Sequence, residues 1–152
     1  MADWKISRSP DILTTLGLGS CVGVTLWDKS RGIGGLAHIM LPSSEGYTQH
    51  NRMKFADTAL KDMLETILRT GASRANLVAK IAGGAHMFSG SGAGNVLKVG
   101  ERNAENCKRI LGEMKIPLLA NDTGGTHGRT IELNIVNGQL KIKTVGFGEK
   151  FI

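Results

Sequence analysis

The sequence has 152 residues, of which 41% are hydrophobic and 21% charged, and this size and apolar content predict a single domain, residues 1–152, around one core. The formal net charge is +6, but the basic residues are dispersed and 5% of residues are aromatic, so we expect a solvated surface rather than a nucleic-acid-binding face. The first nine residues lack the apolar run of a secretory signal, and no stretch reaches the roughly 20 apolar residues of a membrane span, which predicts a cytoplasmic protein without membrane insertion.

Two apolar segments near the start of the chain are predicted to form a β-hairpin. Residues 13–27 and 33–41 favour strands, and the polar tract 28–31 between them suits a loop. Even-numbered positions of the first strand are almost all apolar and should face the core. The odd-numbered positions carry Cys21, whose neighbours on that face are Gly17, Gly19 and Gly23. Because interior glycines often mark close approach by a ligand or another backbone, this face is predicted to leave the thiol uncovered.

The hairpin register decides what lies opposite this thiol. If the loop is centred between Lys29 and Ser30, Cys21 pairs with His38, with Cβ atoms about 4.5–5.5 Å apart. An imidazole at this distance lowers the pKa of a thiol and takes its proton, as cysteine hydrolases require. A loop with an odd number of residues would instead place His38 beside Val22, on the opposite face.

Other interpretations of these residues are structural or metal-binding. A lone cysteine is often a small buried hydrophobe, and a lone histidine on a strand is often a structural side chain. The two cysteines lie far apart in the sequence, which argues against a disulfide framework. A zinc site is not favoured, because paired ligand spacing is absent among Cys21, His38, His86, Cys107 and His127. No phosphate-binding loop motif occurs either, so we expect no metal and no cofactor.

The middle of the chain alternates helical and strand patterns. Residues 51–70 repeat apolar side chains at helical spacing, and Gly71 stands where this helix should end. A buried strand is predicted over residues 77–82, followed by a flexible surface loop at 89–95. A second helix is predicted over residues 100–114.

The remaining segments complete an α/β fold. Cys107 lies on the apolar face of the second helix and is predicted to be a core residue. Residues 117–120 favour a short strand. The Asn-Gly pair at 137 and 138, between apolar segments 130–136 and 139–145, is a strong hairpin signal. Together these elements predict a single-domain sandwich of mixed or antiparallel β-sheets with two main helices.

Several short motifs in this order resemble the chemoreceptor glutamine deamidase family, CheD. The likeness covers nearly the whole chain, and its motifs are residues 15–21 (TLGLGSC), 37–42 (AHIMLP), 54–57 (KFAD), 79–85 (AKIAGGA), 100–103 (GERN) and 122–125 (DTGG). This resemblance implies an α/β sandwich related to the deamidating domain of bacterial necrotizing toxins. It also implies a catalytic cysteine, histidine and threonine, which correspond to Cys21, His38 and Thr15.

The implied reaction is attack by the Cys21 thiolate on the side-chain carbonyl carbon of a substrate glutamine, followed by loss of ammonia and hydrolysis of the thioester. His38 moves the protons, and backbone N–H groups near Ser20 and Cys21, supported by Gly19, stabilise the oxyanion. Gly17 and Gly23 are expected to line the substrate groove.

A role for Thr15 requires the chain to bend. Six residues separate Thr15 from Cys21, which is roughly 20 Å along a straight strand. Gly17 and Gly19 can adopt the backbone angles of a bend. We therefore expect the Thr15 hydroxyl or carbonyl to orient the imidazole of His38.

The resemblance also implies partners, the thioester route suggests a side reaction, and a rival function stays open. The substrates would be the cytoplasmic helices of chemotaxis receptors, with glutamate methyl esters as substrates of a side reaction. A CheC-type phosphatase would be a regulator, with residues 84–88 and 89–95 as rim elements of the groove and His86 as a rim side chain. The alternative is a regulatory binding module for that phosphatase, in which catalysis is incidental.

Overall fold

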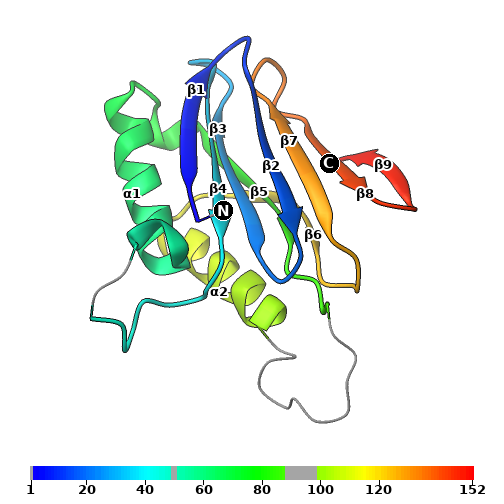
Figure 1. Ribbon diagram of the computed structural model, residues 1–152. Helices are drawn as coiled ribbons and strands as arrows, with labels where there is room; N and C mark the ends of the chain where they lie inside the picture. Colours follow the sequence, from blue (N-terminus) through cyan, green and yellow to red (C-terminus); the bar gives the residue numbers. More distant parts are fainter. Residues whose placement is uncertain (1, 49–50, 88–98) are drawn as a thin grey trace.

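The computed structural model describes residues 2–48, 51–87 and 99–152, and these form an α/β fold of two sheets and two α-helices (Figure 1). The five-stranded sheet has the order β1-β4-β3-β5-β6 and is mixed, since β5 and β6 are parallel. The four-stranded sheet, with the order β2-β7-β8-β9, is antiparallel. The strands are β1 (Trp4–Arg8), β2 (Ile12–Leu18), β3 (Val22–Asp28), β4 (Ile33–Ile39), β5 (Leu77–Gly83), β6 (Leu118–Thr123), β7 (Arg129–Asn134), β8 (Leu140–Thr144) and β9 (Gly148–Phe151). The predicted α/β class with mixed and antiparallel sheets is confirmed.

Three layers enclose two apolar cores. Helices α1 (Ala56–Arg69) and α2 (Val99–Glu113) cover one face of the five-stranded sheet, and the four-stranded sheet covers the other (Figure 1). Val22, Val24 and Leu26 of β3 belong to the core beneath the helices. A second core between the sheets includes Leu18 and Ile131. The central strand β3 is therefore covered on both faces, which is why its sequence is apolar almost throughout.

The predicted strand over residues 13–27 is in fact two strands in different sheets. β2 ends at Leu18, β3 begins at Val22, and residues 19–21 carry the chain from one sheet to the other. The pairing of β2 with β7 shifts between Thr15 and Leu18, and Gly17 has a φ of +67°. Leu16, predicted to face the core, is 66% exposed. In β2 the buried position is odd-numbered (Leu13) before the register shift and even-numbered (Leu18) after it. An uninterrupted period of two could therefore not predict this change of sheet.

The odd-numbered face is not open at Gly23. This residue is buried, and a Cβ atom there would lie 2.3 Å from Cδ1 of Ile131 and 3.0 Å from Cδ1 of Leu18. The missing side chain makes room for the second sheet rather than for a ligand. The prediction that Gly23 lines a substrate groove is therefore wrong, whereas Gly17 is exposed.

The predicted hairpin between β3 and β4 is present, but its register differs by two positions. His38 pairs with Gly23, not with Cys21, and Asp28 pairs with Ile33. The loop still has an even number of residues, so His38 keeps the predicted face, which here points toward the second sheet. At the loop end of the hairpin, the buried carboxylate of Asp28 accepts hydrogen bonds from Ser30 Oγ (2.7 Å) and Arg31 N (3.1 Å) of the loop and from Ser73 N (2.7 Å).

The other predicted elements agree with the structure in type. Helix α1 is preceded by a 3₁₀ turn, Arg52–Lys54, and Gly71 follows it with a φ of +110°. Cys107 on α2 is fully buried. β7 and β8 flank the Asn-Gly pair at 137 and 138, as expected. The edge strands β1 and β9 were not predicted, since each is short and pairs with a single neighbour.

The predicted loop at residues 89–95 lies outside the described residues. Among the helices of the described residues, none is long and apolar enough to cross a membrane.

The start of α2 contacts the segment that follows β5, and this contact predicts opposite effects for two glycine substitutions in one helix. A Cβ atom at Gly100 would lie 2.6 Å from the backbone oxygen of Gly84 and 2.7 Å from that of Ala85. Gly100→Ala should therefore lower the free energy of unfolding by about 1–3 kcal/mol, the usual cost of overpacking. At Gly112, which is exposed and has no neighbour within 4 Å, alanine should raise it by up to about 1 kcal/mol, because glycine is the poorer helix former.

Urea unfolding of the two variants beside the wild type measures both effects. Equal stabilisation by both substitutions would contradict the close approach at Gly100.

Candidate active site

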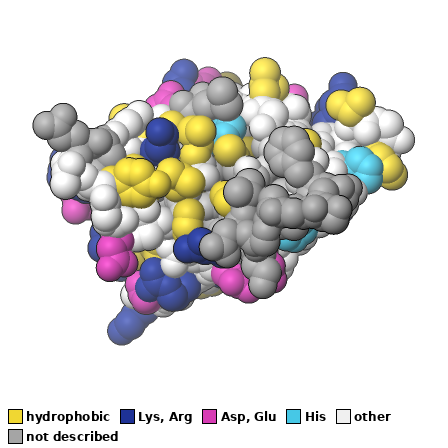
Figure 2. Space-filling model, turned by 60° about the horizontal axis from the view of Figure 1, so that its bottom comes forward, with side chains coloured by type: hydrophobic (Ala, Val, Ile, Leu, Met, Phe, Trp, Pro, Cys, Tyr) yellow, Lys and Arg dark blue, Asp and Glu magenta, His cyan; other side chains and the backbone are white. Residues whose placement is uncertain are grey.

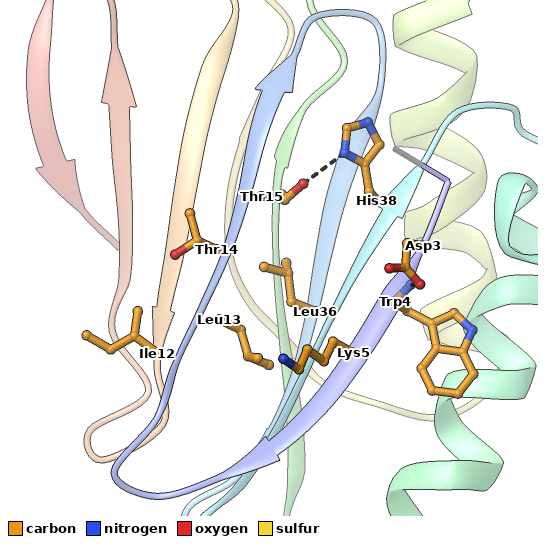
Figure 3. Close-up of a pocket in the computed structure, with 9 residues that line it drawn as sticks. All are labelled: Asp3, Trp4, Lys5, Ile12, Leu13, Thr14, Thr15, Leu36 and His38. Atoms are coloured by element: carbon orange, nitrogen blue, oxygen red, sulfur yellow. Dashed lines mark hydrogen bonds between the residues drawn. The ribbon is translucent and has the colours of Figure 1, made fainter.

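A side-chain hydrogen bond joins the two sheets at the centre of the candidate site. Thr15 on β2 and His38 on β4 point toward each other, and Thr15 Oγ1 lies 2.8 Å from His38 Nδ1 (Figure 3). His38 is 3% exposed and Thr15 is half-buried. The expected contact between the Thr15 hydroxyl and the imidazole is present. It forms because β2 and β4 belong to facing sheets, so the residues approach across the core rather than along one strand.

Burial determines the protonation state of His38. Desolvation by burial lowers the pKa of this imidazole below its ordinary value, so the ring is neutral near pH 7. Nε2 is buried and has no hydrogen-bond partner among the described residues. A proton on Nε2 would leave a buried N–H unsatisfied, which is rarer in proteins than an unsatisfied acceptor. The favoured tautomer therefore carries its proton on Nδ1, donates it to Thr15 Oγ1, and leaves a lone pair on Nε2.

Cys21 lies in the connection between β2 and β3, two residues before the partner of His38. The side chain is half-buried and packs against the core between the sheets. Desolvation by burial raises the pKa of the Cys21 thiol, so it is protonated near pH 7. The expectation that the imidazole lowers this pKa is not met, since His38 Nε2 has no partner within the described part of the chain.

The second cysteine has a different environment. Cys107 is 0% exposed in the core beneath the helices, and burial raises its pKa to about 12. This residue is a small core hydrophobe, as its position on the apolar face of α2 predicted.

The backbone around Cys21 is held from the side of β5. Gly84 N donates to Cys21 O (2.8 Å) and Ala85 N donates to Gly19 O (2.8 Å). A Cβ atom at Gly83 would lie 2.3 Å from Cys21 O, so this approach requires glycine. Within the described residues, the N–H groups of Ser20 and Cys21 have no hydrogen-bond partner. Two free N–H groups beside a thiol are suited to binding a negatively charged oxygen.

The predicted rim segment 84–88 lies beside this connection. A Cβ atom at Gly19 would lie 3.0 Å from Cγ of Met87, a residue that is 46% exposed. His86 is half-buried, and its N–H donates to Gly125 O (2.8 Å). Residue 88 and the predicted rim loop 89–95 lie outside the described residues. The structure therefore describes only residues 84–87 of this predicted rim.

A pocket of about 280 Å³ reaches the Thr15–His38 pair from the side of β1 (Figure 3). Residues of β1, β2 and β4 line this pocket together with Asp3, whereas Cys21 does not. Cys21 belongs instead to the connection between β2 and β3, and this connection lies at one end of the molecule (Figure 1). Figure 2 shows this end, on which hydrophobic side chains gather with basic and acidic side chains around them.

Sequence reasoning assigned no role to Asn103, which lies on α2 behind the connection. This residue is fully buried, and its Nδ2 donates to Ser20 O (2.9 Å) and Met40 O (2.8 Å). The signal was present in the pattern, because Asn103 shares its helix face with the core residues Cys107 and Ile110 at positions i+4 and i+7. A buried amide on such an apolar face is expected to form hydrogen bonds with other buried polar groups.

Comparisons with known proteins agree with the likeness of the motifs. The family model described as "CheD chemotactic sensory transduction" matches residues 40–144, which begin just after His38. Three bacterial relatives, each named "Probable chemoreceptor glutamine deamidase CheD", extend the similarity over almost the whole chain. They come from Caldanaerobacter subterraneus subsp. tengcongensis (47% identical, 100% of this chain and 94% of the relative), Desulfitobacterium hafniense (49%, 100% and 95%) and Moorella thermoacetica (49%, 96% and 89%).

The raised pKa of Cys21 predicts the pH dependence of its alkylation. Iodoacetamide reacts with the thiolate, so a thiol whose pKa is raised above its ordinary value by burial should react slowly at pH 7. Its rate should rise about tenfold per pH unit until the pH approaches that pKa. Mass spectrometry of the intact protein after timed labelling measures this profile.

Two variants assign the labelled residue. Cys107→Ala should keep the profile of the wild type, and Cys21→Ala should remain unlabelled because Cys107 is buried. A rate that is already at its plateau at pH 7 would show that an imidazole–thiolate pair exists before substrate binds.

Proposed function

The chain belongs to the CheD family, and from this membership and the geometry of Thr15, Cys21 and His38 we propose that it is a chemoreceptor glutamine deamidase. In this proposal the protein converts glutamine side chains of chemotaxis receptors to glutamate and releases ammonia. The observation that carries the proposal is the buried imidazole of His38, whose Nδ1 contacts Thr15 while Nε2 has no partner among the described residues. This is the arrangement of a general base that awaits a proton.

The first half-reaction forms a thioester. As the substrate glutamine binds, the Cys21 thiol gives its proton to His38 Nε2, and the sulfur attacks the side-chain carbonyl carbon. The carbonyl oxygen becomes an oxyanion, which accepts hydrogen bonds from the backbone N–H groups of Ser20 and Cys21. The imidazolium then gives its proton to the departing nitrogen, and ammonia leaves. Substrate binding has to complete the contact between the thiol and His38, as is common for sites described without substrate.

The second half-reaction regenerates the enzyme. His38 Nε2 takes a proton from a water molecule, whose oxygen attacks the thioester carbon. The carbon–sulfur bond breaks, the proton returns to the sulfur, and a glutamate is released. A glutamate methyl ester would enter the same cycle with methanol as the leaving group, so methylesterase activity belongs to the proposal as a side reaction.

Substrate and regulator would approach the end of the molecule shown in Figure 2. A pocket of about 300 Å³ lies there between the residues after β4 and the start of α2, lined by Leu41, Pro42, Tyr47 and Val99 among others. Apolar side chains of a receptor helix suit this surface. In the same proposal, a CheC-type phosphatase binds near the site as a regulator, and the fold is related to the deamidating domain of necrotizing toxins.

Deamidation of a purified receptor cytoplasmic fragment tests the proposal directly. The wild type should release ammonia and raise the mass of the fragment by roughly one dalton for each amide converted to an acid. Cys21→Ala should release none, because this variant lacks the thiol that forms the thioester. The binding of a CheC-type phosphatase to both proteins is measured in parallel.

The rival function predicts a different set of results. Wild type and Cys21→Ala that bind the phosphatase equally, while neither releases ammonia, would identify a regulatory binding module instead of an enzyme.

The role of Thr15 predicts a difference between two substitutions. Thr15→Val keeps the shape of the side chain but removes the oxygen that contacts His38 Nδ1. The kcat for ammonia release should fall by roughly 100-fold or more, because the imidazole loses the partner that fixes its tautomer. Thr15→Ser keeps the hydroxyl and should stay within a few fold of the wild type. Equal activity of the valine and serine variants would remove Thr15 from the reaction.

A further inference from the structure

One buried amide connects the backbone on both sides of the candidate site. Asn103 Nδ2 donates to Ser20 O (2.9 Å), directly before Cys21, and to Met40 O (2.8 Å), two residues after His38. Asn103 comes from α2 and is completely buried. A single side chain thus ties the segment that carries the nucleophile to the strand that carries the base.

The orientation of this amide follows from its partners. Both partners are carbonyl oxygens, which can only accept, so the nitrogen of Asn103 must face them. Oδ1 is also buried, and it has no hydrogen-bond partner among the described residues. A buried acceptor without a partner lowers stability. The two donated hydrogen bonds satisfy buried backbone carbonyls, and their effect on the site needs an explanation of its own.

The geometry of the peptide group supplies that explanation. Ser20 C=O and Cys21 N–H belong to the same peptide unit, which is planar, and its oxygen and hydrogen point in opposite directions. A hydrogen bond that holds the oxygen therefore fixes the direction of the N–H. The following peptide is held as well, since Cys21 O accepts from Gly84 N (2.8 Å). The Cys21 N–H, which has no partner in the described part of the chain, is thus held in one direction from both sides.

We propose that Asn103 is a positioning residue, which aims the Cys21 N–H at the oxyanion formed when the thiol attacks the substrate carbonyl. This inference rests on the proposed deamidation. The hydrogen bond at Ser20 O also polarises the peptide group and makes its N–H a stronger donor. Asn103 acts on the transition state through the backbone and does not touch the thiol or the substrate.

The chain provides a matched control on the same helix. Asn106 Nδ2 donates to Pro42 O, a carbonyl in the segment that follows β4. Asn106, which is half-buried, therefore anchors a loop to α2 through one donated hydrogen bond and makes no contact with the peptide group of Cys21. A purely structural role would be shared by the two asparagines, whereas the proposed role belongs to Asn103.

The experiment compares Asn103→Ala, Asn103→Leu and Asn106→Ala with the wild type in the receptor-fragment assay. Both Asn103 variants should lower kcat for ammonia release by roughly 10- to 100-fold, since loss of an oxyanion donor costs about 100- to 1,000-fold. KM should change by less than about twofold, because the N–H serves the transition state. Alkylation of Cys21 by iodoacetamide passes through no oxyanion, so its rate and pH profile should stay at wild-type values. Asn106→Ala should keep the kcat of the wild type.

Other results would overturn the inference. Unchanged kcat in folded Asn103 variants would show that the peptide needs no such support. A parallel fall of kcat and of the alkylation rate, an equal fall in Asn106→Ala, or loss of the folded state in both Asn103 variants by circular dichroism would assign a structural role. The proposed function is tested separately by Cys21→Ala in the same assay. If the wild type releases no more ammonia than Cys21→Ala, the proposed deamidation and the positioning role of Asn103 both fail. If the wild type releases more ammonia than Cys21→Ala and the Asn103 variants match the wild type, only the positioning role fails.

Discussion

The hydrogen bond between Thr15 and His38 is the contact on which the candidate site depends, and it spans two sheets. A buried imidazole needs a polar partner, and here the partner comes from the facing sheet rather than from a neighbouring strand. The geometry of the base is therefore tied to the packing of Leu18 and Ile131 in the core between the sheets. Gly23 contributes to this spacing, because a side chain there would push Ile131 outward. The core between the two sheets therefore contributes to the stability of the fold and also positions the proposed catalytic base.

Burial acts on the two reactive groups in opposite directions. It raises the pKa of Cys21 and lowers that of His38, and both shifts favour the uncharged form. The site at rest is therefore a neutral pair, in which the thiol is less prone to oxidation than a thiolate would be. The same shift on His38 affects folding. Because the unfolded chain binds this proton more readily, the contribution of His38 to stability is present above about pH 6.5 and is lost as the pH falls through the lowered pKa.

Elements with a strong local pattern could be predicted from the sequence, and those set by distant contacts could not. Both helices follow from apolar spacing, and the β7–β8 hairpin follows from Asn137 and Gly138. The β3–β4 register was predicted two positions away from the observed one, because the loop polar tract does not say which residue closes the hairpin. Asp28, at the end of β3, also accepts a hydrogen bond from Ser73, 45 residues away in the sequence, which no local pattern reports. The change of sheet after β2 was missed for the same reason. Thr15 was identified by family resemblance, since its contact with the imidazole crosses between sheets. Asn103 stood within one of the family motifs but was given no role, because the role of a buried amide depends on partners that the fold brings to it.

The glycines behind Cys21 have a consequence for how this protein can vary. Gly83 and Gly84 both have positive φ, and a side chain at either would meet a backbone oxygen, Cys21 O at 2.3 Å or Gly100 O at 2.7 Å. Backbone atoms cannot be exchanged by mutation, so no compensating substitution at a neighbouring position can relieve such a clash. We therefore expect substitutions at Gly83 and Gly84 to displace the backbone beside Cys21 and the start of α2. Adaptation to new substrates has to proceed through the exposed residues around the site.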